Sequence, residues 1–259
     1  MKPRDALFAV VRRARLLRAA YRETAADFEF DPVDRWRFEL ADRKEFFRRA
    51  LWYLAFNGIE GDYVEFGSHG AVTFRLAWAA SRLTGRKRHQ WAFDSFQGLP
   101  PVRDERDRHP MWVEGWMEST EEVFRSLCAR GGLPADAYTT VPGFYSETLA
   151  SNHSGRRPER IAMAYIDCDL YSSTREVLAF LEPYLRTGVL VAFDDYFCFG
   201  DGTVSGEKAA LDEFLASRSS WRLVPYVQFG WHGMSFVVEA SPGLTDEPLK
   251  QQLKMPIKD

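Results

Sequence analysis

Apolar runs of strand length alternate with amphipathic, helix-like segments through the middle and the C-terminal part of the chain. We predict strands at 63–67, 91–94, 138–142, 161–167, 188–193, 223–229 and 234–239. We predict helices at 71–83, after a cap at Ser119 with Glu122 completing a capping box, at 172–185 and at 207–215. This alternation indicates an α/β protein with a mostly parallel sheet and helices on both faces. No helix separates the last two strands, so we expect them to form an antiparallel hairpin at one edge.

The first 60 residues have a different pattern. Residues 1–24 combine apolar positions at helical spacing with seven lysines and arginines, which predicts a basic amphipathic helix. Two placements fit this helix, a membrane surface or the side of its own domain or of a second subunit; we favour the second and expect a homo-oligomer. A further helical segment ends at Asn57-Gly58. We therefore divide the chain into a helical extension (1–60), a main domain (61–240) and a loose tail (241–259).

The composition excludes several classes of protein. The chain has 34 Lys+Arg against 37 Asp+Glu, a net charge of −3, whereas binding of DNA or RNA by bulk charge needs a basic excess. The longest N-terminal apolar run, 6–11, is too short for a membrane span or a signal sequence. The cysteines Cys128, Cys168 and Cys198 form no CxxC pair, and their odd number favours reduced thiols. We expect a cytoplasmic protein without nucleic-acid partners or a membrane span.

Acidic residues lie at the ends of four predicted strands. Glu65-Phe66-Gly67 ends the first strand, Asp94 the second, Asp167-Cys168-Asp169 the fourth and Asp194-Asp195 the fifth. The carboxyl ends of parallel strands meet at one edge of the sheet, where α/β proteins bind their ligands. The acidic residues are therefore expected to share one site.

The turn after the first strand is typical of a nucleotide-like ligand. A strand, a glycine turn and a helix follow one another at Gly67 and Gly70, which lets the backbone approach a ligand closely. Asp94 lies 27 residues after Gly67, at the end of the next strand, where a carboxylate can accept both hydroxyls of a ribose. The G-x-x-G spacing lacks the paired glycines of a dinucleotide fingerprint, and the P-loop, HExxH and GxSxG motifs are absent.

The aspartates after the fourth and fifth strands fit a hard divalent cation. Asp167, Asp194 and Asp195 would lie at neighbouring strand ends, and Mg²⁺ prefers oxygen ligands. Carboxylates packed so closely raise one another's pKa unless a cation compensates. Asp169 would stand beside the metal without binding it. In the alternative interpretation, Asp169 caps the helix near Ser172 and Asp195 only begins a loop.

The segments that carry these residues resemble the macrocin O-methyltransferase family, which includes macrolide and novobiocin sugar methyltransferases. The similarity spans roughly residues 60–240. It is most specific in FDSFQGLP (93–100) and in the pair DCDLY and DDY, whose first aspartates, Asp167 and Asp194, are 27 residues apart. The resemblance implies a class I methyltransferase with a Rossmann-like fold and a seven-stranded, mostly parallel sheet, which uses S-adenosylmethionine and Mg²⁺.

The resemblance also implies roles for individual residues. Glu65 and Gly67 line the methionine side of the cofactor, and Asp94 takes the ribose hydroxyls. The metal ligands are Asp167, Asp194 and Asp195. Asp169 matches a general base, although Leu170-Tyr171 follow it where some relatives have a histidine. The full set expected to bind the cofactor is Glu65, Gly67, Ser68, Gly70, Asp94 and Ser95.

The implied reaction moves a methyl group to a hydroxyl of a small-molecule acceptor, a sugar or a glycosylated natural product. Mg²⁺ would lower the pKa of that hydroxyl, and Asp169 would remove the proton. Residues 100–117, with Trp112 and Trp116, would form a lid that excludes water. Trp231 and His232 are candidates for acceptor contacts; the alternative is a core Trp and a surface His.

Three other functions stay open at this point. Asp167-Cys168-Asp169 also fits the DxD motif of a metal-dependent glycosyltransferase, which leaves Glu65 and Gly67 unexplained. A catechol-like hydroxyl is an alternative acceptor for the same metal chemistry. A non-enzymatic scaffold would use the basic N-terminal helix as its working part.

Overall fold

The computed structural model describes residues 32–150, 155–200, 202–217 and 220–241. The chain divides into two compact units, Met1–Ala41 and Asp42–Asp259. Within the described residues, only the first turns of helix α2 (Pro32–Phe56) belong to the first unit. The predicted basic helix at 1–24 and the tail from residue 242 onward lie outside the described residues. The following paragraphs concern the second unit.

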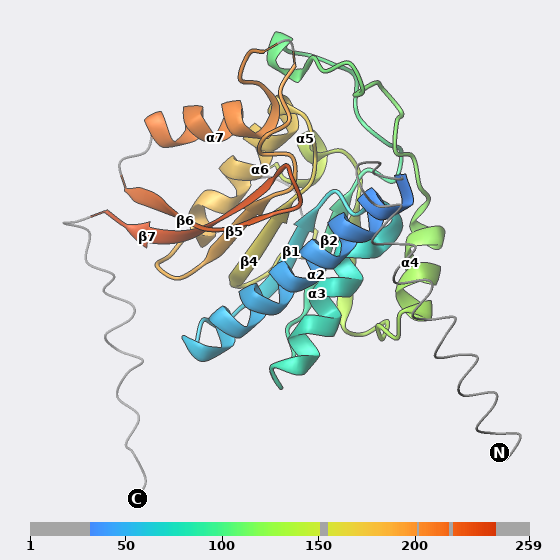
Figure 1. The fold of residues 1–259 in the computed structure, drawn as a ribbon, viewed down its shortest axis with the longest axis vertical. Helices are drawn as coiled ribbons and strands as arrows, with labels where there is room; N and C mark the ends of the chain where they lie inside the picture. Colours follow the sequence, from blue (N-terminus) through green and yellow to red (C-terminus); the bar gives the residue numbers. More distant parts are fainter. Residues whose placement is uncertain (1–31, 151–154, 201, 218–219, 242–259) are drawn as a thin grey trace, which may run out of the picture. The chain divides into compact units, whose positions relative to one another are not determined.

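The second unit is built around a sheet of seven strands (Figure 1). The strands are β1 (Asp62–Phe66), β2 (Gln90–Asp94), β3 (Tyr138–Pro142), β4 (Ile161–Ile166), β5 (Leu190–Phe193), β6 (Trp221–Phe229) and β7 (Gly233–Ala240). Their order is β3-β2-β1-β4-β5-β7-β6. Strands β1 to β5 are parallel, whereas β7 runs antiparallel to both β5 and β6. The predicted mixed sheet with a C-terminal hairpin at its edge is confirmed.

Helices cover both faces of this sheet. The helices after α2 are α3 (Val72–Leu83), α4 (Glu121–Arg130), α5 (Tyr145–Thr148), α6 (Tyr171–Leu181) and α7 (Gly206–Ala216), with short 3₁₀ turns η1 (His69–Ala71), η2 (Glu105–Asp107) and η3 (Glu182–Tyr184). Because side chains alternate along a strand, Tyr63 of β1 packs with α2, α3 and α4, whereas Val64 packs with α6 and α7. Burial on both faces explains why the central strands are almost continuously apolar.

Two local predictions differ from the structure. Helix α4 is capped by Thr120, whose hydroxyl accepts a hydrogen bond from the Val123 N–H (3.3 Å), and not by Ser119. Ser119 lies one residue too early, so Glu122 is not three residues after the cap and the predicted capping box is wrong. Asp169 is not a helix cap either, because α6 begins at Tyr171 after Leu170 and has no side-chain cap. That observation contradicts the alternative interpretation, in which Asp169 caps this helix.

Two further findings concern the helices and the cysteines. Among the described helices, none combines the length and the hydrophobicity that crossing a membrane requires. All three cysteines are free thiols, as expected, with Cys128 and Cys168 buried.

Candidate active site

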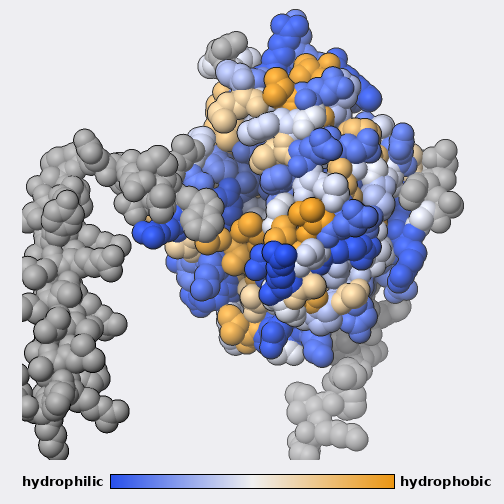
Figure 2. Space-filling model, turned by 90° about the vertical axis from the view of Figure 1, so that its right-hand side faces the viewer, coloured by the Kyte–Doolittle hydropathy of each residue, from blue (hydrophilic) through white to orange (hydrophobic). Residues whose placement is uncertain are grey.

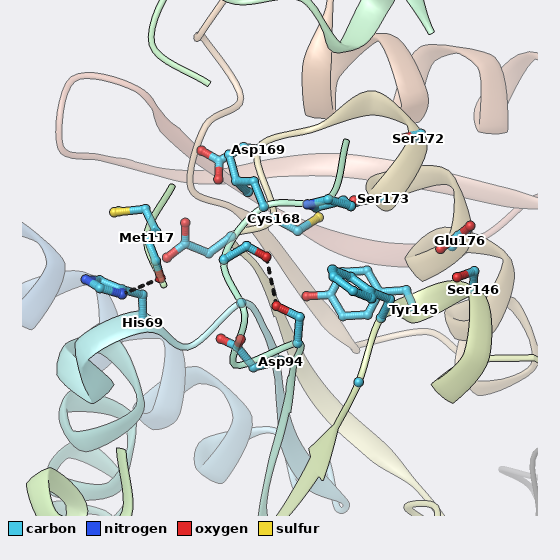
Figure 3. A pocket seen from close by; sticks show the side chains of 18 of the residues that line it. His69, Asp94, Met117, Tyr145, Ser146, Cys168, Asp169, Ser172, Ser173 and Glu176 are labelled. Carbon is cyan, nitrogen blue, oxygen red and sulfur yellow. Dashed lines mark hydrogen bonds between the residues drawn. The ribbon is translucent and has the colours of Figure 1, made fainter. Parts of the chain in front are cut away.

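A cavity lies at the carboxyl ends of β1 to β4 (Figure 3). It holds about 910 Å³, counting the solvent at its mouth. Of the residues expected there, the wall contains Gly67, Asp94, Ser95, Asp167 and Asp169. Glu65, Ser68, Gly70, Asp194 and Asp195 lie outside the wall. The prediction that the strand ends share one site therefore describes the backbone arrangement, while the side chains divide into two groups.

Gly67 is the point at which the exits of β1 and β4 touch. Its φ is +84°, and a Cβ atom there would lie 1.8 Å from the carbonyl oxygen of Asp167. Neighbouring strands hold the turn, because the Gly67 N–H donates to the Phe93 carbonyl (2.9 Å) and the Asp167 N–H donates to the Phe66 carbonyl (2.8 Å). Only glycine combines this backbone conformation with so close an approach.

Asp94 is held in place by the backbone. One carboxylate oxygen accepts from the Ser68 N–H and the other from the Phe96 N–H, both at 2.7 Å. Burial raises the pKa of Asp94, and these two hydrogen bonds oppose that rise. Each oxygen keeps a second lone pair. Asp94 can therefore accept two further hydrogen bonds from a pair of ligand hydroxyls without moving.

Glu65 lies beneath the cavity and not in its wall. The side chain is fully buried and accepts hydrogen bonds from the Thr73 hydroxyl (3.0 Å) and from the Tyr63 hydroxyl. Burial raises the pKa of Glu65 to about 8, although these hydrogen bonds act against the rise. Through Thr73 the carboxyl joins β1 to α3, the two elements on either side of the glycine turn. Its geometry supports the turn.

Much of the cavity wall carries no acidic signature and was missed by sequence reasoning. The turn from β3 into α5 contributes Gly143, Phe144, Tyr145 and Ser146, and α6 contributes Ser172, Ser173 and Glu176. In Figure 3, His69 and Met117 lie at one end of the cavity and Ser146 and Glu176 at the other. A hydrogen bond of 2.8 Å joins the His69 Nδ1 atom to the Met117 carbonyl. The signal that could have located the β3 turn is its position, at the same edge as the other strand ends.

The second group is an acidic triad at the ends of β4 and β5. Asp167, Asp194 and Asp195 each offer an oxygen, and these oxygens lie within 4.8 Å of one another. Opposite oxygens around Mg²⁺ are about 4.2 Å apart, twice the usual ligand distance. Burial and the neighbouring carboxylates raise the pKa of Asp167 and of Asp195. An all-oxygen donor set with excess negative charge fits a hard divalent cation.

Asp194 differs from the other two, because it has a cationic partner. The Arg43 Nε atom donates to one carboxylate oxygen (3.0 Å) and Nη2 to the other (2.7 Å), while the Tyr165 hydroxyl donates to the first. Burial alone would raise the pKa of Asp194, but the charge and hydrogen bonds of Arg43 outweigh it and lower that pKa. Arg43 is 151 residues away in the chain, and no local pattern pointed to it.

Asp169 lies between the cavity and the triad. It lines the cavity, and its carboxyl interacts with that of Asp195. Its backbone φ is +59°, a left-handed conformation that costs a non-glycine residue about 1 kcal/mol or more. Burial and the charge of Asp195 raise the pKa of Asp169. A carboxyl in this position can accept a proton from a group bound at the triad.

Glu207, at the start of α7, forms hydrogen bonds with both acidic loops, the one after β4 and the one after β5. This residue was not predicted. It is fully buried. One of its carboxylate oxygens accepts from the Cys168 N–H (3.2 Å) and the other from the Asp195 N–H (2.9 Å). The spacing between the fourth and fifth strand ends is thus set by a side chain from a third element.

The alternative given for Trp231 and His232 was a tryptophan in the core and a histidine on the surface. The structure shows the reverse. His232 is buried, and its Nδ1 atom is hydrogen-bonded to the Asp194 carbonyl, whereas the Trp231 side chain is 51% exposed. His232 therefore belongs to the packing behind the triad. The Cys198 thiol also faces the triad and donates to Asp195 (3.2 Å).

The expected lid, 100–117, is an ordered loop tied to α6. Asp107 is fully buried and accepts from the backbone N–H groups of Arg103, Asp104 and Ser172. Trp112 is buried, with its ring near Gly206, whereas Trp116 is 36% exposed. Exposed apolar side chains of this loop include Met111 and Val113. Figure 2 shows apolar patches of small extent among polar residues on one face of the molecule.

Comparison with known proteins places this geometry in context. A family model described as Macrocin-O-methyltransferase (TylF) matches residues 10–220. The 8-demethyl-8-(2,3-dimethoxy-alpha-L-rhamnosyl)-tetracenomycin-C 4'-O-methyltransferase of Streptomyces olivaceus is 34% identical over 148 residues, 54% of each protein. The mycinamicin III 3''-O-methyltransferase of Micromonospora griseorubida is 31% identical over 150 residues, 54% of this chain and 57% of that enzyme. The chain thus spans a little over half the length of these curated relatives.

A solved structure agrees with these matches. The O-methyltransferase NovP superposes with a TM-score of 0.62 and 26% sequence identity, over 76% of this chain and 79% of that chain. The sheet with its C-terminal hairpin and the cavity at its carboxyl edge thus occur in a fold shared with an O-methyltransferase.

Proposed function

Because the chain belongs to the macrocin O-methyltransferase family, we propose that it moves the methyl group of S-adenosylmethionine to a sugar hydroxyl of a natural product, with Mg²⁺ bound at the acidic triad. The observation that carries this proposal is the position of Asp167. This residue belongs to the triad and also lines the cavity that contains Asp94. A ligand in the cavity and a cation at the triad would therefore be neighbours.

We assign the cavity to the cofactor. Asp94 would accept the ribose hydroxyls through the lone pairs that the Ser68 and Phe96 N–H groups leave free. The turn at Gly67 would lie against the methionine part, since no side chain projects there. Ser95 would stand beside the ribose site, and its hydroxyl already donates to the Gly98 carbonyl (2.8 Å). Glu65, Ser68 and Gly70 would shape this wall without forming its surface.

When bound, S-adenosylmethionine supplies an electrophilic methyl group and Mg²⁺ lowers the pKa of a hydroxyl that it binds. Asp167, Asp194 and Asp195 would hold the cation. Asp169 would accept the proton of the acceptor hydroxyl at a carboxylate oxygen, because it lines the cavity beside the triad. The loop held by Asp107 would keep water from this space.

We propose a sugar acceptor because one curated relative is named as a 4'-O-methyltransferase of a rhamnosyl tetracenomycin. A catechol is the competing acceptor, since the same cation and base would serve it. A glycosyltransferase would need a nucleotide-sugar donor, and the acidic pair at the end of β5 and the glycine turn at Gly67 have no assigned task in that reaction.

The test combines binding and turnover. Calorimetry should detect S-adenosylmethionine binding, and UDP-glucose should not compete. Methyl transfer from labelled cofactor should occur with an α-L-rhamnoside and Mg²⁺, and should stop with EDTA. Lack of cofactor binding at millimolar concentration would overturn the proposal. Methylation of catechol but not of the rhamnoside would replace the acceptor class and keep the reaction.

A further inference from the structure

The ion pair between Arg43 and Asp194 differs from an ordinary surface salt bridge in its burial. Both side chains are nearly buried, at 15% and 7% exposure. The guanidinium engages both carboxylate oxygens, through Nε and Nη2. Such a forked pair fixes the orientation of the carboxylate as well as its charge. The pair joins α2 to one of the three proposed metal ligands.

Arg43 is itself held in place from a second side. Its Nη2 atom donates to the His232 Nε2 atom (3.2 Å), since a guanidinium has no acceptor. The opposite ring nitrogen of His232 then carries the hydrogen and donates to the Asp194 carbonyl. His232 thus connects the guanidinium to the backbone of the residue that the guanidinium binds. The closed ring of contacts prevents the carboxylate from rotating.

Counting lone pairs shows what Asp194 can still do. A carboxylate offers about four acceptor positions, two on each oxygen. Arg43 takes one on each oxygen, and Tyr165 takes the second on Oδ1. One position on Oδ2 is left. Asp194 can therefore bind a cation through one oxygen, but not through both.

We propose that Arg43 is a positioning residue that restricts Asp194 to one-oxygen coordination and so makes the triad select Mg²⁺ over Ca²⁺. Mg²⁺ requires near-octahedral geometry, which carboxylates satisfy through single oxygens. Ca²⁺ takes more ligands at longer distances and often binds a carboxylate through both oxygens. The inference rests on the proposed function, because it concerns the same metal site.

The test measures cation binding directly. Calorimetry with the full-length chain, saturated with S-adenosylhomocysteine, gives the Kd of Mg²⁺ and of Ca²⁺ separately. The wild type should bind Mg²⁺ more tightly. In Arg43→Met both oxygens become available, so the preference for Mg²⁺ should fall by about tenfold, the low end of the effect of losing an outer partner of a metal ligand.

Three further variants separate the causes. Arg43→Lys keeps the charge but has a single donor atom and should lose the preference as well. Tyr165→Phe frees one lone pair and should shift the preference in the same direction by less; it also serves if Arg43→Met fails to fold. Arg48→Met, on the exposed side of the same helix, should leave the preference unchanged. Thermal melts monitor folding of each variant.

The outcomes are distinct. A preference unchanged within about twofold in Arg43→Met, Arg43→Lys and Tyr165→Phe overturns the inference and leaves the proposed function standing. A wild-type preference retained in Arg43→Lys assigns the effect to charge and also overturns it. Cation binding that appears only after Arg43 is replaced shows that the guanidinium occupies the place of the cation, and this overturns the inference. Absence of Mg²⁺ binding in wild type and all variants overturns the metal part of the proposed function itself.

Discussion

The two halves of the carboxyl edge are organised by different forces. In the half formed by β1, β2 and β3, backbone groups fix the geometry. Asp94 is held by two N–H donors, and the turn depends on a glycine. In the half formed by β4 and β5, side chains that are distant in the sequence fix the geometry. Arg43 and Glu207 hold the acidic loops from α2 and α7.

This difference indicates what each half requires for its task. In the first half the carboxyl groups of Glu65 and Asp94 already accept hydrogen bonds, so this half can receive a neutral or singly charged ligand without rearrangement. The second half brings five acidic side chains close together, and Arg43 pairs with one of them, Asp194; the five are Asp167, Asp169, Asp194, Asp195 and Glu207. Like charges at this density are costly in a buried site, so the second half should respond to cations and the first should not.

The largest expected effect comes from removing divalent ions. EDTA should lower methyl transfer by about 10³-fold or more, corresponding to the loss of ~4 kcal/mol of transition-state stabilisation. The Kd of S-adenosylmethionine should stay within about threefold, because Asp94 and the glycine turn do not depend on the cation. Activity assays and calorimetry on the same sample measure both, and added Mg²⁺ should restore the rate.

The same contrast can be tested with a substitution. Asp167→Asn keeps the shape of the side chain but removes one charge from the triad, so Mg²⁺ binding should weaken and cofactor binding should persist. Asp136→Asn, an exposed residue before β3, is the matched control. Equal losses of cofactor and cation binding would mean that the halves are not independent.

The next largest effect is a loss of stability at Gly67, where the two halves of the carboxyl edge meet. Gly67→Ala should destabilise the protein by about 2–4 kcal/mol, because the added Cβ overlaps the Asp167 carbonyl and the backbone is left-handed. Gly85→Ala has a similar φ, +70°, but meets nothing within 4 Å, so only about 1 kcal/mol of backbone strain is expected. Urea unfolding compares the two. Equal stabilities would show that the strand ends can separate at little cost.

The contrast between the halves also explains how far the sequence could predict the site. Strand ends, glycine turns and the acidic pairs are local patterns, and they located Gly67, Asp94 and Asp167 at one edge. Arg43 reaches Asp194 across 151 residues, and Glu207 reaches Cys168 across 39. Such partners depend on helix packing, which no local period specifies. Their identity therefore had to come from the structure.

Glu65 shows the opposite case, a local pattern that could have been interpreted further. It lies in β1 with Tyr63, two residues apart and on the same face of the strand. Alternation therefore turns its carboxyl toward the face covered by α2, α3 and α4, where Thr73 of α3 lies. The residues that reach the cavity come after the strand has ended, from Gly67 onward. The alternation of side chains along β1 therefore predicts that Glu65 supports the turn and does not contact a ligand in the cavity.

A smaller effect should be confined to the first half. Asp94→Asn should raise the Kd of S-adenosylmethionine by about 10–100-fold, the range for loss of hydrogen bonds to a charged group. The amide also leaves one of the Ser68 and Phe96 N–H groups without its acceptor. Mg²⁺ affinity, measured by calorimetry, should stay within about twofold. A parallel fall in Mg²⁺ affinity would show that Asp94 communicates with the triad.

The last expected effect concerns the buried Glu65 carboxyl and appears only as a change of stability with pH. Its pKa in the folded protein is about 8, raised by burial from an ordinary value of 4.5. Between these values the folded state holds a proton that the unfolded chain has lost. The group therefore stabilises the fold below pH 4.5, and this contribution is lost as pH rises toward 8, by up to about 1.4 kcal/mol per pH unit.

Glu65→Gln cannot titrate, so its free energy of unfolding should fall less between pH 6 and 8 than that of the wild type. Urea unfolding at several pH values measures the two slopes, with Glu122→Gln on the exposed side of α4 as control. Parallel slopes would mean that Glu65 is ionised in the folded protein, and that the first half, too, contains a buried negative charge.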